Sequence, residues 1–137
     1  MEVHGRGNSL VRMSDFLHIL PEVQEALRSG QAVVALESTI VAHGMPYPQN
    51  LRTAQRLESI VRAGGAVPAT VAVVNGKLQV GCTIEDLTAL ATSPDVLKVS
   101  RRDLPLALAR KTLGATTVSG TLIGCELAGV RVFATGG

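Results

Sequence analysis

Short aliphatic runs alternate along most of this chain with longer segments in which apolar residues recur every three or four positions. The longer pattern is typical of amphipathic helices, and the short runs are typical of buried strands. In residues 51–63, arginines separate the members of an apolar stripe, Leu51, Ala54, Leu57 and Val61. The pattern predicts helices over residues 21–30, 51–63, 83–93, 103–113 and 119–128, and strands over residues 32–36, 70–74, 78–80, 96–99, 115–118 and 130–134.

Local signals support several of these elements. Pro21 suits a first helical turn and Gly30 suits a helix end, while Asn75-Gly76 between two aliphatic runs indicates a hairpin. Strands that alternate with helices predict an α/β layered domain with a mainly parallel sheet. Because the sequence stops directly after its last strand, we expect this sheet to be incomplete at its C-terminal end.

The N-terminal segment, residues 1–15, is polar and mostly aperiodic, which predicts a disordered tail before a domain portion over residues 16–137. The tail lacks the apolar stretch of a signal peptide. We therefore expect a cytoplasmic protein, with a mitochondrial presequence as the open alternative. Cys82 and Cys125 lack the spacing of a metal site, so buried free thiols are predicted.

Composition narrows the classes of partner. Only 2% of the residues are aromatic, so the chain lacks the platforms on which single-stranded nucleic acid stacks. A net charge of +2 is too small to indicate a nucleic-acid partner, and no uncharged run reaches the roughly 18 residues of a membrane span. The basic residues gather once, in residues 98–102, which favours a site for a small anionic ligand.

Polar or glycine-rich sequence follows four predicted strands, at residues 37–39, 100–103, 119–121 and 135–137. The carboxyl ends of parallel strands meet at one edge of a sheet, where α/β proteins bind ligands. We therefore expect the four segments to lie together. The first opens a long polar loop with a single carboxylate, Glu37, which is a natural place for acid–base chemistry.

Each of these features also has a plain structural interpretation. Glu37 would be a turn carboxylate, and Lys98 would be a solvated lysine on an edge strand. Residues 101–102 would be a solvated helix entrance with one salt bridge to Asp103. Residues 119–121 would be a helix N-cap, although the same backbone N–H groups can hold a phosphate.

The residues alone thus offer one carboxylic acid, one lysine and several backbone amides suited to phosphate. This set would suit a phosphorylated sugar, but it is incomplete for ordinary glycoside hydrolysis, which needs two placed carboxyl groups. His43 matches no metal-ligand pattern and GxGxxG is absent, so the residues predict neither a metal site nor a dinucleotide site.

Seven unusual motifs carry a resemblance to one enzyme family. They are residues 33–40 (VVALESTI), 43–46 (HGMP), 48–50 (PQN), 65–70 (GAVPAT), 98–105 (KVSRRDLP), 114–118 (GATTV) and 132–137 (VFATGG). Through them the chain resembles the pseudouridine-5'-phosphate glycosidases, also called the indigoidine-synthesis A-like family. The resemblance implies reversible cleavage of the C–C glycosidic bond of pseudouridine 5'-phosphate to uracil and ribose 5-phosphate. It also implies that Glu37 is the proton donor and that Lys98 and the Val118 backbone bind this phosphosugar nucleoside.

The resemblance further implies groups that this sequence does not supply. The family uses a divalent metal, typically Mn²⁺, held by an aspartate, and a lysine that forms a Schiff base with the opened ribose. Neither residue has a matching position here, and Lys111, in a predicted helix, is no substitute. We therefore expect a truncated, inactive fragment of an enzyme that is a homo-oligomer, by resemblance a trimer, when complete. The alternatives are a noncatalytic short form that binds the full-length protein and a different α/β enzyme that uses Glu37 and Lys98 alone.

Overall fold

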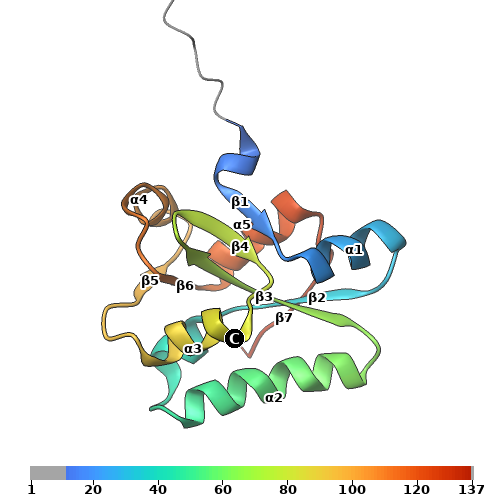
Figure 1. The fold of residues 1–137 in the computed structure, drawn as a ribbon, viewed down its shortest axis with the longest axis horizontal. Helices are drawn as coiled ribbons and strands as arrows, with labels where there is room; N and C mark the ends of the chain where they lie inside the picture. Colours follow the sequence, from blue (N-terminus) through green and yellow to red (C-terminus); the bar gives the residue numbers. More distant parts are fainter. Residues whose placement is uncertain (1–11, 137) are drawn as a thin grey trace, which may run out of the picture.

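The computed structural model describes residues 12–136, which form a seven-stranded sheet with helices on both faces (Figure 1). A 3-10 turn (η1) opens this region, and a π-helical turn (η2) follows the second strand. In chain order the elements are η1 (Met13–Asp15), β1 (Leu17–Ile19), α1 (Pro21–Ser29), β2 (Val33–Leu36), η2 (Ile40–Gly44), α2 (Gln49–Ala63), β3 (Val67–Val74), β4 (Lys77–Val80), α3 (Ile84–Thr92), β5 (Leu97–Val99), α4 (Leu104–Arg110), β6 (Gly114–Thr116), α5 (Val118–Ala128) and β7 (Val132–Ala134).

The long strand β3 organises the sheet. Its first half pairs with β2 in parallel, and its second half pairs with β4 and β6 in antiparallel fashion. The order along the sheet is β1-β4-β3-β2-β7, and β6 and β5 extend it from β3. The remaining pairings, β1 with β4, β2 with β7 and β5 with β6, are parallel. The predicted α/β fold with a mainly parallel sheet is therefore confirmed.

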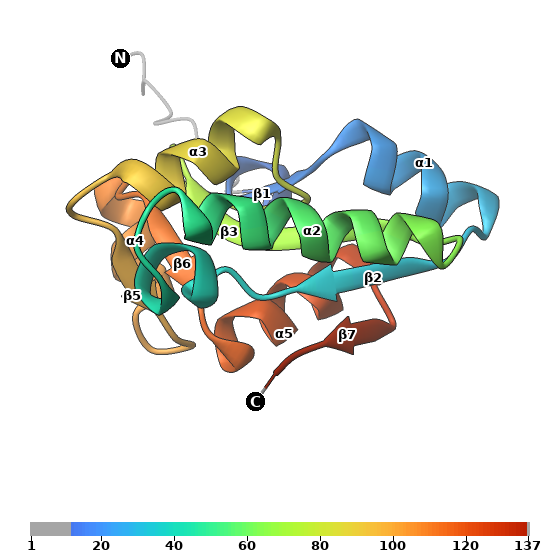
Figure 2. The same ribbon diagram turned by 90° about the horizontal axis from the view of Figure 1, so that it is seen from below.

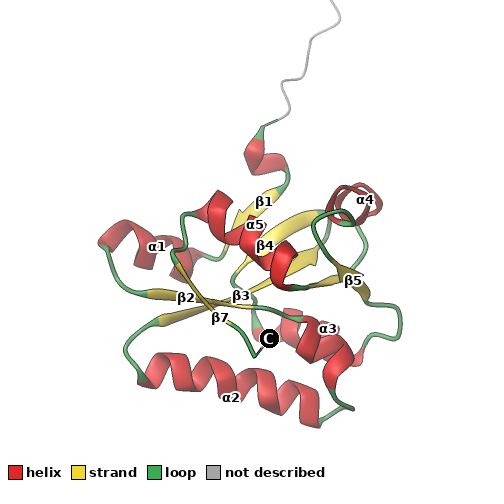
Figure 3. Cartoon of the chain, turned by 180° about the vertical axis from the view of Figure 1, so that it is seen from behind, coloured by secondary structure: helices red, strands yellow, loops and turns green. Residues whose placement is uncertain are grey.

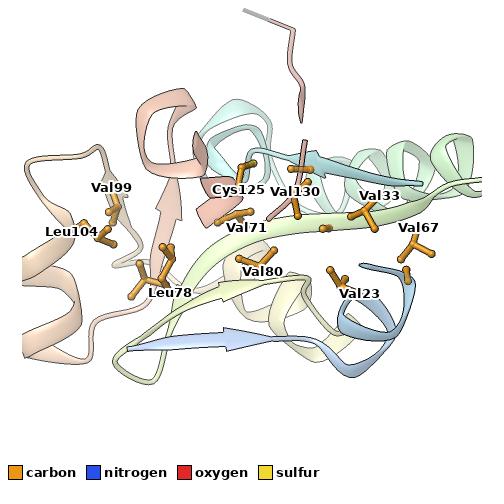
Figure 4. Close-up of a cluster of buried hydrophobic side chains, with 14 of the residues drawn as sticks. Val23, Val33, Val67, Val71, Leu78, Val80, Val99, Leu104, Cys125 and Val130 are labelled. Carbon is orange, nitrogen blue, oxygen red and sulfur yellow. The ribbon is translucent and has the colours of Figure 1, made fainter. Parts of the chain in front are cut away.

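Alternate residues of β3 point into two aliphatic clusters, one on each face. Val71 and its neighbours at odd positions pack with Val23 of α1 and Cys125 of α5. Ala72 packs on the opposite face, with residues of α2 and α3. Figure 4 shows the first cluster gathered along β3. Since helices cover both faces, the strand reads as a continuous aliphatic run rather than an alternating one.

Most predicted elements are confirmed, with shifted ends. The helix predicted over residues 103–113 ends at Arg110, because Lys111 adopts a left-handed conformation (φ 53°) and caps it. Strand β6 begins at Gly114, one residue before the predicted start of this strand at residue 115. The Asn75-Gly76 turn has positive φ at both residues, as the hairpin prediction requires. Strand β1 was not predicted.

The predicted N-terminal tail of residues 1–15 falls mainly on residues 1–11, which lie outside the described region. Its last part is structured: Met13–Asp15 form η1, where the Arg12 backbone N–H donates to Asp15 Oδ2 at 2.8 Å. None of the described helices has the length and apolar character that would let it cross a bilayer. Cys82 and Cys125 are both free and buried, as predicted, and burial raises the pKa of each thiol.

Glu58, a half-buried carboxylate on α2, should make stability depend on pH. Burial, the larger effect, raises its pKa above the ordinary value, although the Thr70 hydroxyl donates to Glu58 Oε1 at 2.7 Å. The folded state therefore binds this proton more tightly than the unfolded state does. The stabilisation is complete below the unfolded pKa and is lost as pH rises through the folded pKa.

Glu58→Gln keeps an acceptor for Thr70 and carries no charge, so we expect it to remove this loss. Urea unfolding between about pH 4 and pH 8 should show that the free energy of unfolding of the variant increases relative to that of the wild type as pH rises. Glu126→Gln, an exposed position on α5, is the matched control and should follow the wild type. Parallel curves for Glu58→Gln and the wild type would contradict the expectation.

Candidate functional site

The carboxyl ends of β2, β5 and β6 meet at one place, next to the middle of β3. The Ser38 backbone N–H and the Thr39 hydroxyl both donate to the Thr116 carbonyl, at 3.2 and 2.9 Å. The Thr117 N–H donates to the Val99 carbonyl at 3.0 Å. The segment after β2 is thereby fastened to the end of β6, and β6 to the end of β5. The reason differs from the predicted one: β2 pairs with β3 in parallel and β6 pairs with β3 antiparallel, so the two strands run toward each other and their carboxyl ends meet beside Val71. Only β5 and β6 are parallel neighbours here.

A cavity of about 430 Å³ opens where these strands end, and it is lined by Glu37, Thr39, Lys98, Thr117, Val118 and Ser119. All three residues predicted for the site, Glu37, Lys98 and Val118, therefore lie around one hollow. Glu37 also borders a second groove of about 280 Å³, whose other walls include Leu36, Ile40, Leu57 and Ala134. The carboxylate thus stands between a polar cavity and a largely apolar groove.

Thr135 orients Glu37 from the other side. Its hydroxyl donates to Glu37 Oε1 at 2.6 Å across 98 positions of sequence. The contact follows from the register of the parallel pair β2 and β7, in which Leu36 lies opposite Ala134, so that the next residues of both strands emerge together. The expectation that residues 37–39 and 135–137 lie together is therefore met, whereas the hydrogen bond itself was not predicted.

A buried network of hydroxyl groups fixes the strand ends. Ser38 Oγ donates to the Val71 carbonyl at 2.6 Å and accepts from the Thr116 N–H at 2.8 Å. Thr116 Oγ1 donates to the same carbonyl at 2.7 Å and lies 2.9 Å from Thr121 Oγ1. Ser38, Thr116 and Thr121 are fully buried. The sequence interpretation placed Ser38 in a polar loop, whereas it belongs to the core directly beside Glu37.

The N-terminus of α5 forms another wall of the cavity. The helix begins at Val118 with Thr117 as N-cap, so the predicted start at residue 119 and the predicted N-cap at residues 119–121 are wrong. The Thr117 side chain does not cap the helix, and the first N–H groups of a helix have no intrahelical partner. A Cβ on Gly120 would lie 2.6 Å from the Val99 carbonyl, so only glycine lets α5 approach β5 this closely. The result is a positively polarised helix end near Lys98.

Of the basic residues in the cluster at 98–102, Lys98 alone lines the cavity. It is exposed on β5, which is an edge strand within the described sheet. Arg102 Nε lies 3.8 Å from Asp103 Oδ1, the predicted salt bridge, and both arginines are exposed. A hydrogen bond from the Ser100 hydroxyl and, to a smaller extent, one from the Ser100 backbone N–H lower the pKa of Asp103 below its ordinary value. Residues 101–103 therefore form the exposed turn that leads into α4, as the plain structural interpretation of this segment predicts.

Residues 12–136 contain no group of three His, Cys, Asp or Glu side chains that could hold a metal ion. His43 is exposed on η2, and Lys111 ends α4. The donor set present here therefore does not fit the divalent metal that the resemblance implies, and no step proposed below uses one.

The fold and this cavity define an α/β protein with a polar cavity at the carboxyl ends of β2, β5 and β6, the kind of place where α/β proteins bind ligands. A family model described as "Indigoidine synthase A like protein" matches residues 22–137, and the chain belongs to this family. It is 60% identical over 125 residues to a pseudouridine-5'-phosphate glycosidase of Symbiobacterium thermophilum and 57% identical over 122 residues to one of Alkaliphilus metalliredigens. These matches cover 91% and 89% of this chain, but only 41% and 40% of the relatives.

Two solved structures share the fold. One is the prealnumycin C-glycosynthase AlnA in complex with ribulose 5-phosphate, with 41% identity and a TM-score of 0.79. The other is an indigoidine synthase A-like protein of Thermotoga maritima, with 30% identity and a TM-score of 0.78. Each match covers 89% of this chain and 39% of the solved chain. The chain therefore spans about 40% of the length of the proteins it matches.

Proposed function

We propose that this chain supplies the proton-donor and phosphosugar-binding part of a pseudouridine-5'-phosphate glycosidase site. The observation that carries the proposal is that Glu37, Lys98 and Val118 line one cavity at the carboxyl ends of β2, β5 and β6. The names of the relatives and the pentose phosphate bound by the C-glycosynthase of the same fold support this substrate class.

Glu37 would protonate the uracil carbon that leaves the sugar. Cleavage of a C–C glycosidic bond gives the electron pair of that bond to the base, so an acid must deliver a proton to the same carbon. Thr135 donates its hydrogen bond to Oε1, which leaves Oε2 to carry the transferred proton. After transfer, the carboxylate would still accept from Thr135 and stay oriented for the reverse reaction.

Lys98 and the N-terminus of α5 would hold the phosphosugar. The lysine supplies a point charge, and the unpaired N–H groups of a first helical turn favour a phosphate. Val118 contributes through its backbone, which agrees with its position as the first residue of α5. The sugar phosphate would then lie across the cavity from Glu37.

The Schiff-base lysine and the Mn²⁺-binding aspartate implied by the resemblance would come from another part of the family fold. Residues 1–137 alone should then bind phosphosugar without cleaving pseudouridine 5'-phosphate. We further propose that the completed enzyme is cytoplasmic and assembles as a homo-oligomer, by resemblance a trimer.

Uracil release tests this function. We compare residues 1–137 with a fusion protein that joins them to the part of the Symbiobacterium relative that follows the matched segment. With Mn²⁺ present, the fusion protein should release uracil from pseudouridine 5'-phosphate and the isolated chain should not. A folded fusion protein without turnover would refute the proposed function, and turnover by the isolated chain would refute its dependence on the other part.

Lys98→Met in the fusion protein should raise KM for pseudouridine 5'-phosphate by roughly tenfold, the effect of losing a charge-assisted contact worth about 1.5–3 kcal/mol. Lys111→Met, an exposed lysine outside the cavity, is the matched control and should leave KM unchanged. Equal effects of the two substitutions on KM would show that net charge, rather than the position of Lys98, determines binding.

A further inference from the structure

Ser119 lines the cavity, but the proposed function gives its side chain no task. It is the second residue of α5, it is half-buried, and it shares the hollow with Lys98 and Glu37. Figure 2 shows the start of α5 beside β5, β6 and the segment that follows β2. A ligand that fills this hollow therefore meets the Ser119 side chain together with Lys98.

Three of the residues that line the cavity carry hydroxyl groups, and two of these groups donate to main-chain carbonyls. Thr39 Oγ1 donates to the Thr116 carbonyl at 2.9 Å, and Thr117 Oγ1 donates to the Val99 carbonyl at 3.4 Å. Ser119 Oγ differs, because within residues 12–136 the one acceptor in its reach is Thr117 Oγ1, at 3.3 Å. Hydroxyl groups normally bond at about 2.5–3.0 Å, so this contact is long. The Ser119 hydroxyl hydrogen is therefore available to a better acceptor.

A main-chain group holds the oxygen of Ser119 in place. The Arg101 backbone N–H donates to Ser119 Oγ at 3.0 Å, which attaches the turn after β5 to the start of α5. Figure 3 shows α5 in front of the sheet, with β5 beyond one end of the helix. A hydroxyl has two acceptor lone pairs and one hydrogen that rotates to suit its surroundings. Because Arg101 occupies one lone pair, the oxygen keeps its position while the hydrogen can turn toward a ligand.

We propose that the Ser119 hydroxyl donates a hydrogen bond to the phosphate group of the bound phosphosugar. On binding, its hydrogen would turn from Thr117 Oγ1 to a phosphate oxygen, and a charged acceptor makes a shorter and stronger bond than a neutral one. Lys98 attracts an anion as a point charge, whereas Ser119 adds a donor whose position the protein sets. The inference deepens the proposed function and rests on it, because the phosphosugar is the ligand assigned there.

Ligand titrations of residues 1–137, followed by amide NMR, test the role of Ser119. Ser119→Ala should weaken the binding of ribose 5-phosphate and of inorganic phosphate by the same factor, roughly tenfold, because both ligands lose one charge-assisted hydrogen bond. Ser119→Thr keeps a hydroxyl at this position and should bind both ligands like the wild type. Circular dichroism melts show that each variant is folded.

Ser100→Ala is the matched control. It removes another serine hydroxyl from the same turn, one that donates to Asp103 Oδ2 at 2.5 Å and does not line the cavity. Its affinity for both ligands should equal that of the wild type. An effect equal to that of Ser119→Ala would show that the shape of the turn, rather than the Ser119 hydroxyl, determines binding, and would overturn the inference.

The outcomes separate this inference from the proposed function. In the fusion protein, Ser119→Ala should raise KM for pseudouridine 5'-phosphate by a similar factor and leave kcat unchanged. An active fusion protein whose KM does not respond to Ser119→Ala overturns the role of Ser119 and leaves the function standing. Phosphate binding that depends on Ser119 in the isolated chain, with a folded fusion protein that releases no uracil, supports this inference and counts against the function. Weaker binding of ribose 5-phosphate with unchanged binding of phosphate, or no saturable binding of either ligand by the wild type, would overturn the inference.

Discussion

Glu37→Gln in the fusion protein is expected to lower kcat for cleavage of pseudouridine 5'-phosphate by about 10²–10⁴-fold, the usual contribution of a positioned general acid. Glutamine has the size of glutamate and still offers an oxygen to the Thr135 hydroxyl, which lies 2.6 Å from Glu37 Oε1. It carries no proton that it can transfer to carbon. KM should change little, because the proposed phosphosugar contacts come from Lys98 and α5.

Glu58→Gln is the matched control for this substitution. Glu58 is also a glutamate with a threonine partner, but it lies on α2 and does not line the cavity. Its substitution should leave kcat unchanged. A Glu37→Gln rate within about threefold of the unsubstituted fusion protein would show that another group delivers the proton.

Ser38→Ala should destabilise residues 1–137 by about 1–3 kcal/mol, the typical cost of leaving a buried polar group without a partner. The Thr116 N–H would lose its acceptor, and the Val71 carbonyl would keep only the Thr116 hydroxyl. Every buried side-chain nitrogen and oxygen within residues 12–136 already has a hydrogen-bond partner. No unpaired side-chain group is therefore available to replace the lost Ser38 hydroxyl. The free energy of unfolding from urea titration measures this loss.

Ser59→Ala provides the comparison, because it removes an exposed serine hydroxyl that donates to the Gln55 carbonyl within α2. Its effect should stay within about 0.5 kcal/mol. If Ser38→Ala were equally mild, the network would not be what holds the ends of β2, β3 and β6 together. Glu37 would then owe its position to other contacts.

The helices and most strands could be predicted from sequence, because their apolar residues follow regular periods and because glycine and proline mark their ends. The double pairing of β3 could not, since nothing local indicates that one aliphatic run joins β2 with its first half and β4 with its second. Strand β1 was also not predicted, and neither was the early end of α4, which follows from the left-handed conformation of Lys111.

The site was partly predictable for a topological reason. Glu37 and Lys98 were expected near one another on the assumption that their strands are parallel, and they do line one cavity. The physical reason is different, because β2 and β6 run toward each other along β3 and β5 lies parallel to β6. Val118 entered only through the family resemblance. The meeting of residues 37–39 with residues 135–137 was expected. The buried hydrogen bonds of Ser38 and the hydrogen bond from Thr135 to Glu37 were not, because they depend on partners 33 to 98 positions away, which no periodicity encodes. The catalytic and binding roles of Glu37, Lys98 and Val118 stay predictions.

The central claim is that the cavity between Glu37, Lys98 and Val118 binds the phosphosugar, and it can be tested on residues 1–137 without any partner. Amide NMR spectra are recorded while ribose 5-phosphate is titrated in, with inorganic phosphate as the reference ligand. We predict saturable shifts centred on Lys98, Val118 and Ser119, tighter for ribose 5-phosphate than for phosphate and lost in Lys98→Met. Shifts centred elsewhere on the molecule, or none that saturate, would contradict the claim.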